Sequence, residues 1–78
     1  MPILASYTYL EKQHEAMPPQ WFYALSVQPT LFGDWSVVRE WGRVGSPGRV
    51  KVKRYTSQAA AETAFDHLVQ AKYQQGYR

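Results

Sequence analysis

A turn-rich segment at residues 41–48 constrains the fold of this chain more than any other part of it. The segment reads Trp-Gly-Arg-Val-Gly-Ser-Pro-Gly, and three of its eight residues are glycine. Proline presets φ for the second position of a tight turn and glycine accepts a positive φ at the third, so residues 46–49 are predicted to form the turn. The runs on either side, 35–43 and 49–55, alternate in the manner of β-strands. The segment therefore predicts an antiparallel hairpin.

Alternation along the hairpin predicts which side chains share a face. In the second run, Arg49, Lys51 and Lys53 alternate with valines, and we expect the valines to face the helix or the second strand while the cations project the other way. In the first run, one face carries Trp35, Val37, Arg39, Trp41 and Arg43. Antiparallel pairing would set this face beside the cations of the second run. A bulge near Gly42 is the alternative, because it would redirect the residues that end the first run.

Two more strands are predicted upstream of the hairpin. Residues 7–13 combine tyrosine and threonine with a weak alternation, and residues 21–28 are the most strand-like run of the chain. The second of these has an apolar face that we expect to lie in the core, formed by Trp21, Tyr23, Leu25 and Val27. Residues 14–20, with two consecutive prolines, and residues 29–34 are predicted connections. Leu31 and Phe32 are expected to tuck against the edge of the domain.

The C-terminal part of the chain predicts one amphipathic helix of about 18 residues. Thr56 or Ser57 can accept a hydrogen bond from a free N–H in its first turn, and Gly76 is suited to follow its last turn. The stripe expected to cover the sheet consists of Ala61, Ala64, Phe65, Leu68, Val69 and Lys72. The predicted fold class is therefore α+β, a four-stranded antiparallel sheet with one amphipathic C-terminal helix packed across it.

Length and composition limit the classes of protein to which the chain can belong. Its 78 residues are too few to build a second core, so residues 1–78 are predicted to form a single domain. The absence of cysteine excludes disulfides and thiolate metal sites. No apolar run is long enough for a membrane span and the first ten residues do not resemble a secretory signal, so no membrane association and a cytoplasmic location are expected.

Residues suited to catalysis do not form a recognisable pattern. His14 and His67 lie far apart, no second histidine stands at a metal-ligand spacing, and the acidic residues are scattered singly. The three glycines of residues 41–48 do not match a phosphate-binding fingerprint, and they precede a strand where such motifs precede a helix. We therefore expect a protein that is not an enzyme, with no cofactor, no metal and no small-molecule substrate.

Positive charge is concentrated around the hairpin. The chain has a formal net charge of +3, and six of its nine lysine and arginine residues lie within residues 39–54, namely Arg39, Arg43, Arg49, Lys51, Lys53 and Arg54. Cations that flank an exposed indole suit a nucleic acid, because the cations neutralise phosphates while the ring stacks on a base or sugar. The alternative is a solvated strand face whose lysines discourage pairing at the edge of the sheet.

Residues 41–45, Trp-Gly-Arg-Val-Gly, resemble the signature of the WGR domain, a module of eukaryotic poly(ADP-ribose) polymerases and of bacterial proteins that include short standalone ones. The resemblance extends over about 55 to 60 residues. It includes the strand that contains Phe22 and Tyr23, the basic run from Lys51 to Tyr55, and the alanine-rich helix that ends near Gly76. It implies an antiparallel sheet with a helix across it.

The resemblance also implies roles for two residues of the motif. In the polymerases the domain contacts DNA near a strand break, the motif tryptophan packs against the terminal nucleotide, and the motif arginine contributes to contacts that link DNA binding to neighbouring domains. These roles fall on Trp41 and Arg43.

The resulting hypothesis is a non-catalytic nucleic-acid-binding module with DNA as the expected partner, at ends, nicks or single-stranded portions. Trp41 would be exposed and stack, Arg43 would contact phosphate or brace the loop, and phosphates would be held by Arg39, Arg49, Lys51 and Lys53. The alternative hypothesis is a protein-interaction module that is anchored on a partner by Trp41.

Overall fold

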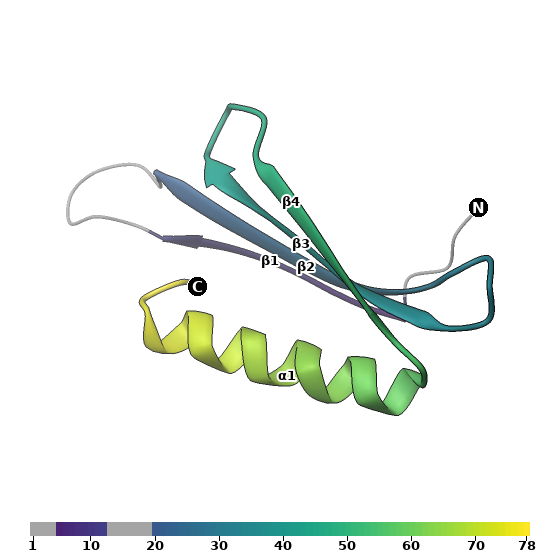
Figure 1. Cartoon of the computed structure of the whole chain (residues 1–78). Helices are drawn as coiled ribbons and strands as arrows, with labels where there is room; N and C mark the ends of the chain where they lie inside the picture. The colour runs from purple at the N-terminus through teal and green to yellow at the C-terminus, as the bar shows by residue number, and fades with distance from the viewer. Residues whose placement is uncertain (1–4, 13–19) are drawn as a thin grey trace.

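The fold is an antiparallel sheet with one helix packed against one of its faces (Figure 1). It is seen in a computed structural model that describes residues 5–12 and 20–78. Within these residues the elements are β1 (Ser6–Lys12), β2 (Trp21–Pro29), β3 (Trp35–Arg43), β4 (Arg49–Tyr55) and α1 (Gln58–Gln74). The strands lie in the order β1-β2-β3-β4, so β1 and β4 form the two edges. The predicted α+β class and the predicted order of elements are confirmed.

The predicted bounds agree closely with the observed ones. The strands predicted over 35–43 and 49–55 are β3 and β4, and β2 is one residue longer than predicted. The register from β2 to β3 continues through Gly42 without a bulge. The end of the first predicted strand and nearly all of the predicted connection over 14–20 lie outside the described residues.

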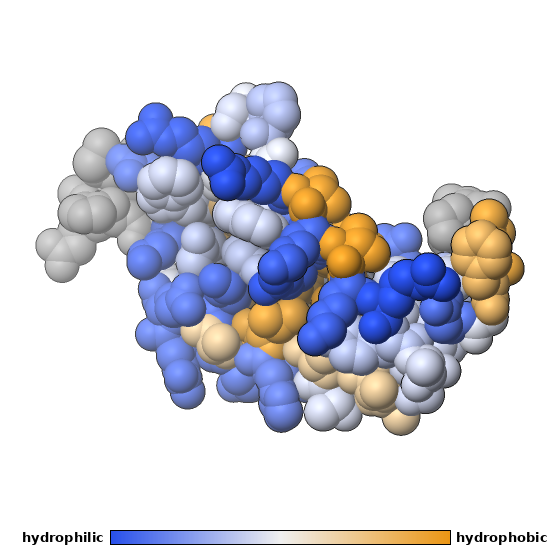
Figure 2. Space-filling view, viewed as in Figure 1, coloured by the Kyte–Doolittle hydropathy of each residue, from blue (hydrophilic) through white to orange (hydrophobic). Residues whose placement is uncertain are grey.

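The tight turn between β3 and β4 was predicted three residues too late. Gly45 has the positive φ, +88°, and the N–H of Ser46 donates to the carbonyl of Arg43 over 3.2 Å. The turn is therefore formed by residues 43–46. Gly45 takes the third position, where a type II turn needs a positive φ. The connection between β2 and β3 also differs from the prediction, because Leu31 and Phe32 are 98% and 83% exposed and form an apolar patch at that turn (Figure 2).

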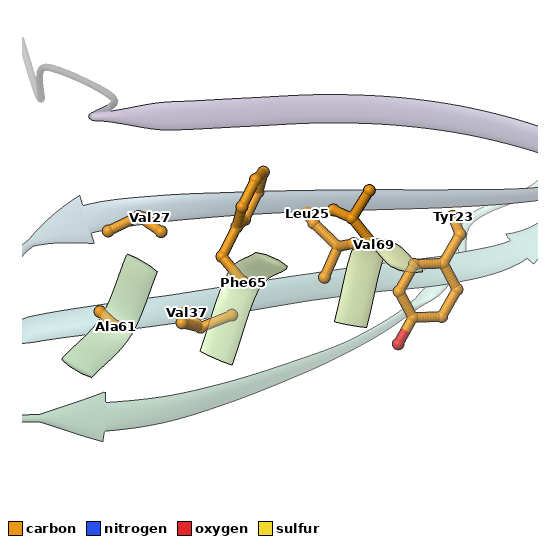
Figure 3. Close-up of a cluster of buried hydrophobic side chains, with 7 residues drawn as sticks. All are labelled: Tyr23, Leu25, Val27, Val37, Ala61, Phe65 and Val69. Carbon is orange, nitrogen blue, oxygen red and sulfur yellow. The ribbon is translucent and has the colours of Figure 1, made fainter. Parts of the chain in front are cut away.

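The core lies between α1 and the central strands of the sheet. Leu25, Val27 and Val37 are almost fully buried, and α1 contributes Ala61, Phe65 and Val69 to the same cluster (Figure 3). The helical residues are spaced by four, which places them on one face of α1. The predicted apolar stripe is thus confirmed as the surface that covers the sheet.

Both ends of α1 are fixed by the residues that the sequence suggested. Ser57 is the N-cap, and its hydroxyl accepts a hydrogen bond from the N–H of Ala60 at 3.1 Å. Gly76 follows the C-cap residue with φ of +96°. Within the described residues, no helix combines the length and the apolar character that crossing a membrane requires.

The predicted orientation of β4 is wrong, because its cations and not its valines share the face that carries the helix. The register places Lys51 opposite Arg39, and Arg39 opposite the buried Leu25, so all three lie on the helix side. Val50 and Val52 face the other side and are more than half exposed. Cations are tolerated on the helix side because α1 packs mainly on β2 and β3, which leaves the margin of the sheet at β4 open to solvent.

Candidate nucleic-acid interface

A basic groove runs between β4 and α1. It encloses about 360 Å³, and its polar walls are formed by Arg39, Lys51, Lys53 and His67. Its floor is apolar and includes Val37, Ala64 and Leu68. We call this feature the basic groove. Positive side chains above an apolar floor can hold phosphates at the rim while sugars or bases rest on the floor.

Strand pairing brings the cations of the basic groove together. Arg39 is the partner of Lys51, and Lys53 is the partner of Val37 in the next row of the same face. The guanidinium of Arg39 also donates to the hydroxyl of Tyr23 at 3.4 Å, and the ammonium of Lys53 lies 5.5 Å from the centre of the Tyr55 ring. The structure thus juxtaposes three of the six residues that the sequence predicted for the site.

His67 belongs to this groove as well, although the sequence suggested only a position near the helix surface. It is exposed on α1 and lines the groove opposite β4. No pattern along the chain connects His67 to the hairpin, since the two meet only when α1 packs on the sheet.

Negative charge is absent from the polar walls of the basic groove in the described part of the chain. The ion pair of the described residues lies outside the groove and joins Arg54 to Asp34 at 2.8 Å. Arg54 points to the opposite face from Lys51 and Lys53. Glu62 of α1 instead accepts a hydrogen bond from Ser6, at the other edge of the sheet. Uncompensated cations along one groove form the kind of positive potential that attracts a polyanion.

Trp41 is partly buried, so the prediction of an exposed indole at this position is wrong. Its ring stacks on Tyr23 with the centroids 5.9 Å apart and the planes at 17°, and it packs against the core cluster. The guanidinium of Arg39 lies 5.8 Å from the centre of the indole. Tyr23 is the cross-strand partner of Trp41, and it contacts Tyr77 edge-on. Trp41 therefore packs on the core through Tyr23 while it also lies beside Arg39 of the basic groove.

Trp21 is the more exposed indole at this end of the sheet. It is 41% exposed although the sequence placed it in the core, because it is the first residue of β2 and lies beyond the core cluster. Arg43 is its partner across the sheet, and the guanidinium lies 5.3 Å from the centre of the indole. Arg43 thus lies beside Trp21, while Arg49 is paired with Trp41.

A second group of cations adjoins Tyr23 and was missed by sequence reasoning. The ammonium of Lys72 lies 4.3 Å from the centre of the Tyr23 ring. Burial lowers the pKa of Lys72, and the positive charges of Arg39 and Lys12 lower it further. The only sign in the sequence was the position of Lys72 at the end of the apolar stripe of α1. The positive surface therefore extends from the basic groove past Arg39 to the end of the helix.

Two glycines allow the ends of β3 and β4 to approach closely. A Cβ atom at Gly48 would lie 2.6 Å from the carbonyl oxygen of Trp41 and 2.8 Å from the ring of Phe22. A Cβ atom at Gly42 would lie 3.0 Å from the Cα of Gly48. The glycine that follows Trp41 in the motif therefore leaves room for the close approach of the two backbones, and Gly48 leaves room for the carbonyl of Trp41.

The cations of the basic groove and the partly exposed ring of Trp21 are groups that can interact with a ligand by charge and by stacking. Within the described residues, no group of three or more His, Cys, Asp or Glu side chains is placed to hold a metal ion.

Comparison with known proteins places this chain in a family. The chain is 34% identical over 70 residues to the uncharacterized protein y4dW of Sinorhizobium fredii, and the match covers 90% of the chain. It covers 34% of y4dW, so the chain spans about a third of the length of this curated relative. No solved structure gives a significant match. The sequence profile of the WGR domain matches residues 7–78, and WGR domains are known as nucleic-acid-binding modules in poly(ADP-ribose) polymerases. The chain therefore belongs to the WGR domain family.

Proposed function

We propose that this chain is a single non-catalytic domain that binds nucleic acid, with DNA as the expected partner, along the helix side of its hairpin. The observation that carries the proposal is the basic groove. Arg39, Lys51 and Lys53 line it together, and no carboxylate of the described residues lies within ion-pair distance of them. Solvent-exposed cations that neutralise phosphates release counterions, which supplies most of the affinity of such surfaces.

The aromatic residues at the motif end of the groove have separate roles in the proposal. Trp21, which is 41% exposed and lies beneath Arg43, is the ring available to stack on a base at an end or in a single-stranded portion. Trp41, stacked on Tyr23, offers only its remaining edge and mainly positions Arg39 and Arg49. Arg43 and Arg49 would hold phosphates at this end.

The experiment is fluorescence anisotropy with labelled duplex, nicked and single-stranded oligonucleotides at several salt concentrations. If three to five phosphates are neutralised, log affinity should fall with log salt at a slope of roughly −3 to −5. The double variant Lys51→Gln/Lys53→Gln should reduce this slope by about 2 and weaken duplex binding by about 50-fold near 0.1 M salt, at about 0.9 log units per phosphate.

The matched control is Arg54→Gln, which removes one charge from the same strand but from the opposite face. It should leave affinity within about twofold of the wild type, because Arg54 faces away from the basic groove and its charge is compensated by Asp34. If net charge alone determined binding, the control, which removes one charge where the double variant removes two, would show about half of the double variant's loss in log affinity. That result would refute the groove as the site.

The alternative of a protein-interaction module anchored by Trp41 is disfavoured by the packing of that residue, since hot-spot anchors need a ring that a partner can bury. Salt separates the two functions. Phosphate binding weakens steeply as salt rises, whereas an aromatic-anchored interface changes little.

A further inference from the structure

The face of the sheet opposite α1 carries a second surface, with chemistry unlike that of the basic groove. No described helix covers this face (Figure 1), and Tyr7, Tyr9, Val50 and Val52 are each about half exposed on it. The two tyrosines lie on one edge strand and the two valines on the other, and Val38 lies between them in the row of Tyr7 and Val52. Exposed apolar side chains gathered on one face mark interaction surfaces in soluble proteins. Their exposure has no role in nucleic-acid binding at the basic groove.

The open face is hollowed along β2. Ala24 and Ser26 are small, whereas their partners Tyr9 and Tyr7 on β1 are large. On the other side, β3 carries Glu40 and Val38 in the same rows. The result is a trough of about 270 Å³ whose lining includes Tyr7, Tyr9, Phe22, Ala24, Val38 and Glu40. We call it the open-face trough.

The charges around the open-face trough are negative. Glu40 is exposed at its edge, between Ala24 and Val50, and no cation of the described residues pairs with it. Glu11 also faces this side, where it accepts a hydrogen bond from the hydroxyl of Tyr9 at 3.0 Å. Arg54, which points to the same side, is paired with Asp34. Phosphates would be repelled here, so the surface disfavours a second stretch of nucleic acid or an anionic lipid.

The aromatic side chains add a preference for a cation. Tyr9 and Phe22 stack with their centroids 6.0 Å apart and their planes at 8° to each other. The negative face of such rings attracts a guanidinium, and a carboxylate beside them can accept two parallel hydrogen bonds from it. The stem of an arginine would at the same time pack on Val38 and Ala24. Lysine fits less well, because it lacks the planar fork.

We propose that the open-face trough binds an arginine side chain of a partner protein, presented by a segment whose neighbouring residues are apolar. Glu40 pairs with the guanidinium, the exposed ring of Tyr9, supported from behind by Phe22, contacts it, and Val50 and Val52 bury the flanking apolar residues. The partner would thus bind on one face while the basic groove remains free on the other.

The test begins with selection of random heptapeptides displayed on phage against the immobilised full chain, with counter-selection on Glu40→Gln. Selected peptides should contain arginine beside valine, leucine or isoleucine. The affinity of synthetic copies of these peptides for the chain should fall by about tenfold or more in Glu40→Gln, because a charged hydrogen-bonded pair is lost. The same loss is expected when the arginine of the peptide is replaced by its uncharged isostere citrulline. Amide NMR shifts on peptide addition should map to Tyr7, Tyr9, Ala24 and Glu40.

Asp66→Asn is the control, since it removes an exposed carboxylate from α1. It should leave peptide affinity unchanged, and oligonucleotide affinity should be the same in Glu40→Gln as in the wild type. The proposal is overturned by enrichment of peptides without arginine, by no enrichment at all, or by shifts confined to the basic groove. It is also overturned if sedimentation shows a dimer that Glu40→Gln dissociates, since a second copy would then occupy the trough.

Discussion

The close approach of Gly48 to β3 makes a quantitative prediction about the hairpin. In Gly48→Ala the new methyl group would meet the carbonyl oxygen of Trp41 at 2.6 Å and the ring of Phe22 at 2.8 Å. Phe22 is only 7% exposed and cannot swing aside, so the backbone of β3 or β4 has to move. Overpacking of this kind costs about 1–3 kcal/mol, and because backbone atoms are involved we expect this variant to lose about 3 kcal/mol.

Gly45→Ala is the matched comparison within the same hairpin. Among the described residues, no atom beyond its two chain neighbours lies within 4 Å of a Cβ at Gly45, so the expected cost comes from its φ of +88° and is about 1 kcal/mol. Urea denaturation followed by tryptophan fluorescence gives both free energies of unfolding. The difference of about 2 kcal/mol should appear as a melting temperature about 8–16 °C lower for Gly48→Ala than for Gly45→Ala. Equal stability of the two variants would refute the steric argument.

Two further predictions concern the turn between β2 and β3. The variant Leu31→Ser/Phe32→Ser should keep the free energy of unfolding within about 0.5 kcal/mol of the wild type, because both side chains are almost fully exposed; a thermal melt in which it loses more than about 1 kcal/mol would show that the two residues pack. The hydrogen bond that Thr30 donates to Asp34 lowers the pKa of this carboxyl below its ordinary value of 3.8, and the hydrogen bond and the positive charge of Arg54 lower it further. A carboxylate with a depressed pKa stabilises the fold at neutral pH and loses that contribution as pH falls below about 4, so Asp34→Asn should be less stable than the wild type at pH 7 and should approach it near pH 2 in urea titrations.

The fold was predictable from the sequence wherever its determinants are local. The bounds of β3 and β4 follow from alternation, and the ends of α1 follow from Ser57 and Gly76. The turn position was less predictable, because both Gly45 and Gly48 suit a turn and only the structure shows that Gly48 is needed for close contact with Trp41. A single sequence does not show whether a glycine is needed because its φ is positive, as at Gly45, or because there is no room for a Cβ atom, as at Gly48.

The site was predictable only in its composition. Alternation shows that Lys51 and Lys53 share a face, but it does not show which face the helix covers or how far the helix extends toward β4. Trp41 stacks on Tyr23, which lies 18 residues before it in the chain, and Tyr23 is contacted in turn by Tyr77, which lies 36 residues after Trp41. Such packing partners leave no mark in the periodicity of a strand.

The register of β4 links the turn to both surfaces of the domain. A slip of one residue would move Val50 and Val52 into the basic groove and would place Lys51 and Lys53 on the open face beside Glu40, because successive side chains of a strand point to opposite sides. Neither the basic groove nor the open-face trough would survive that exchange. Gly48 packs tightly against Trp41 and Phe22 directly before β4 begins at Arg49. A slip would place a residue with a side chain at this position, so the close packing stabilises the observed register. We therefore expect the motif and its turn to determine the charge of both faces as well as the local shape of the hairpin.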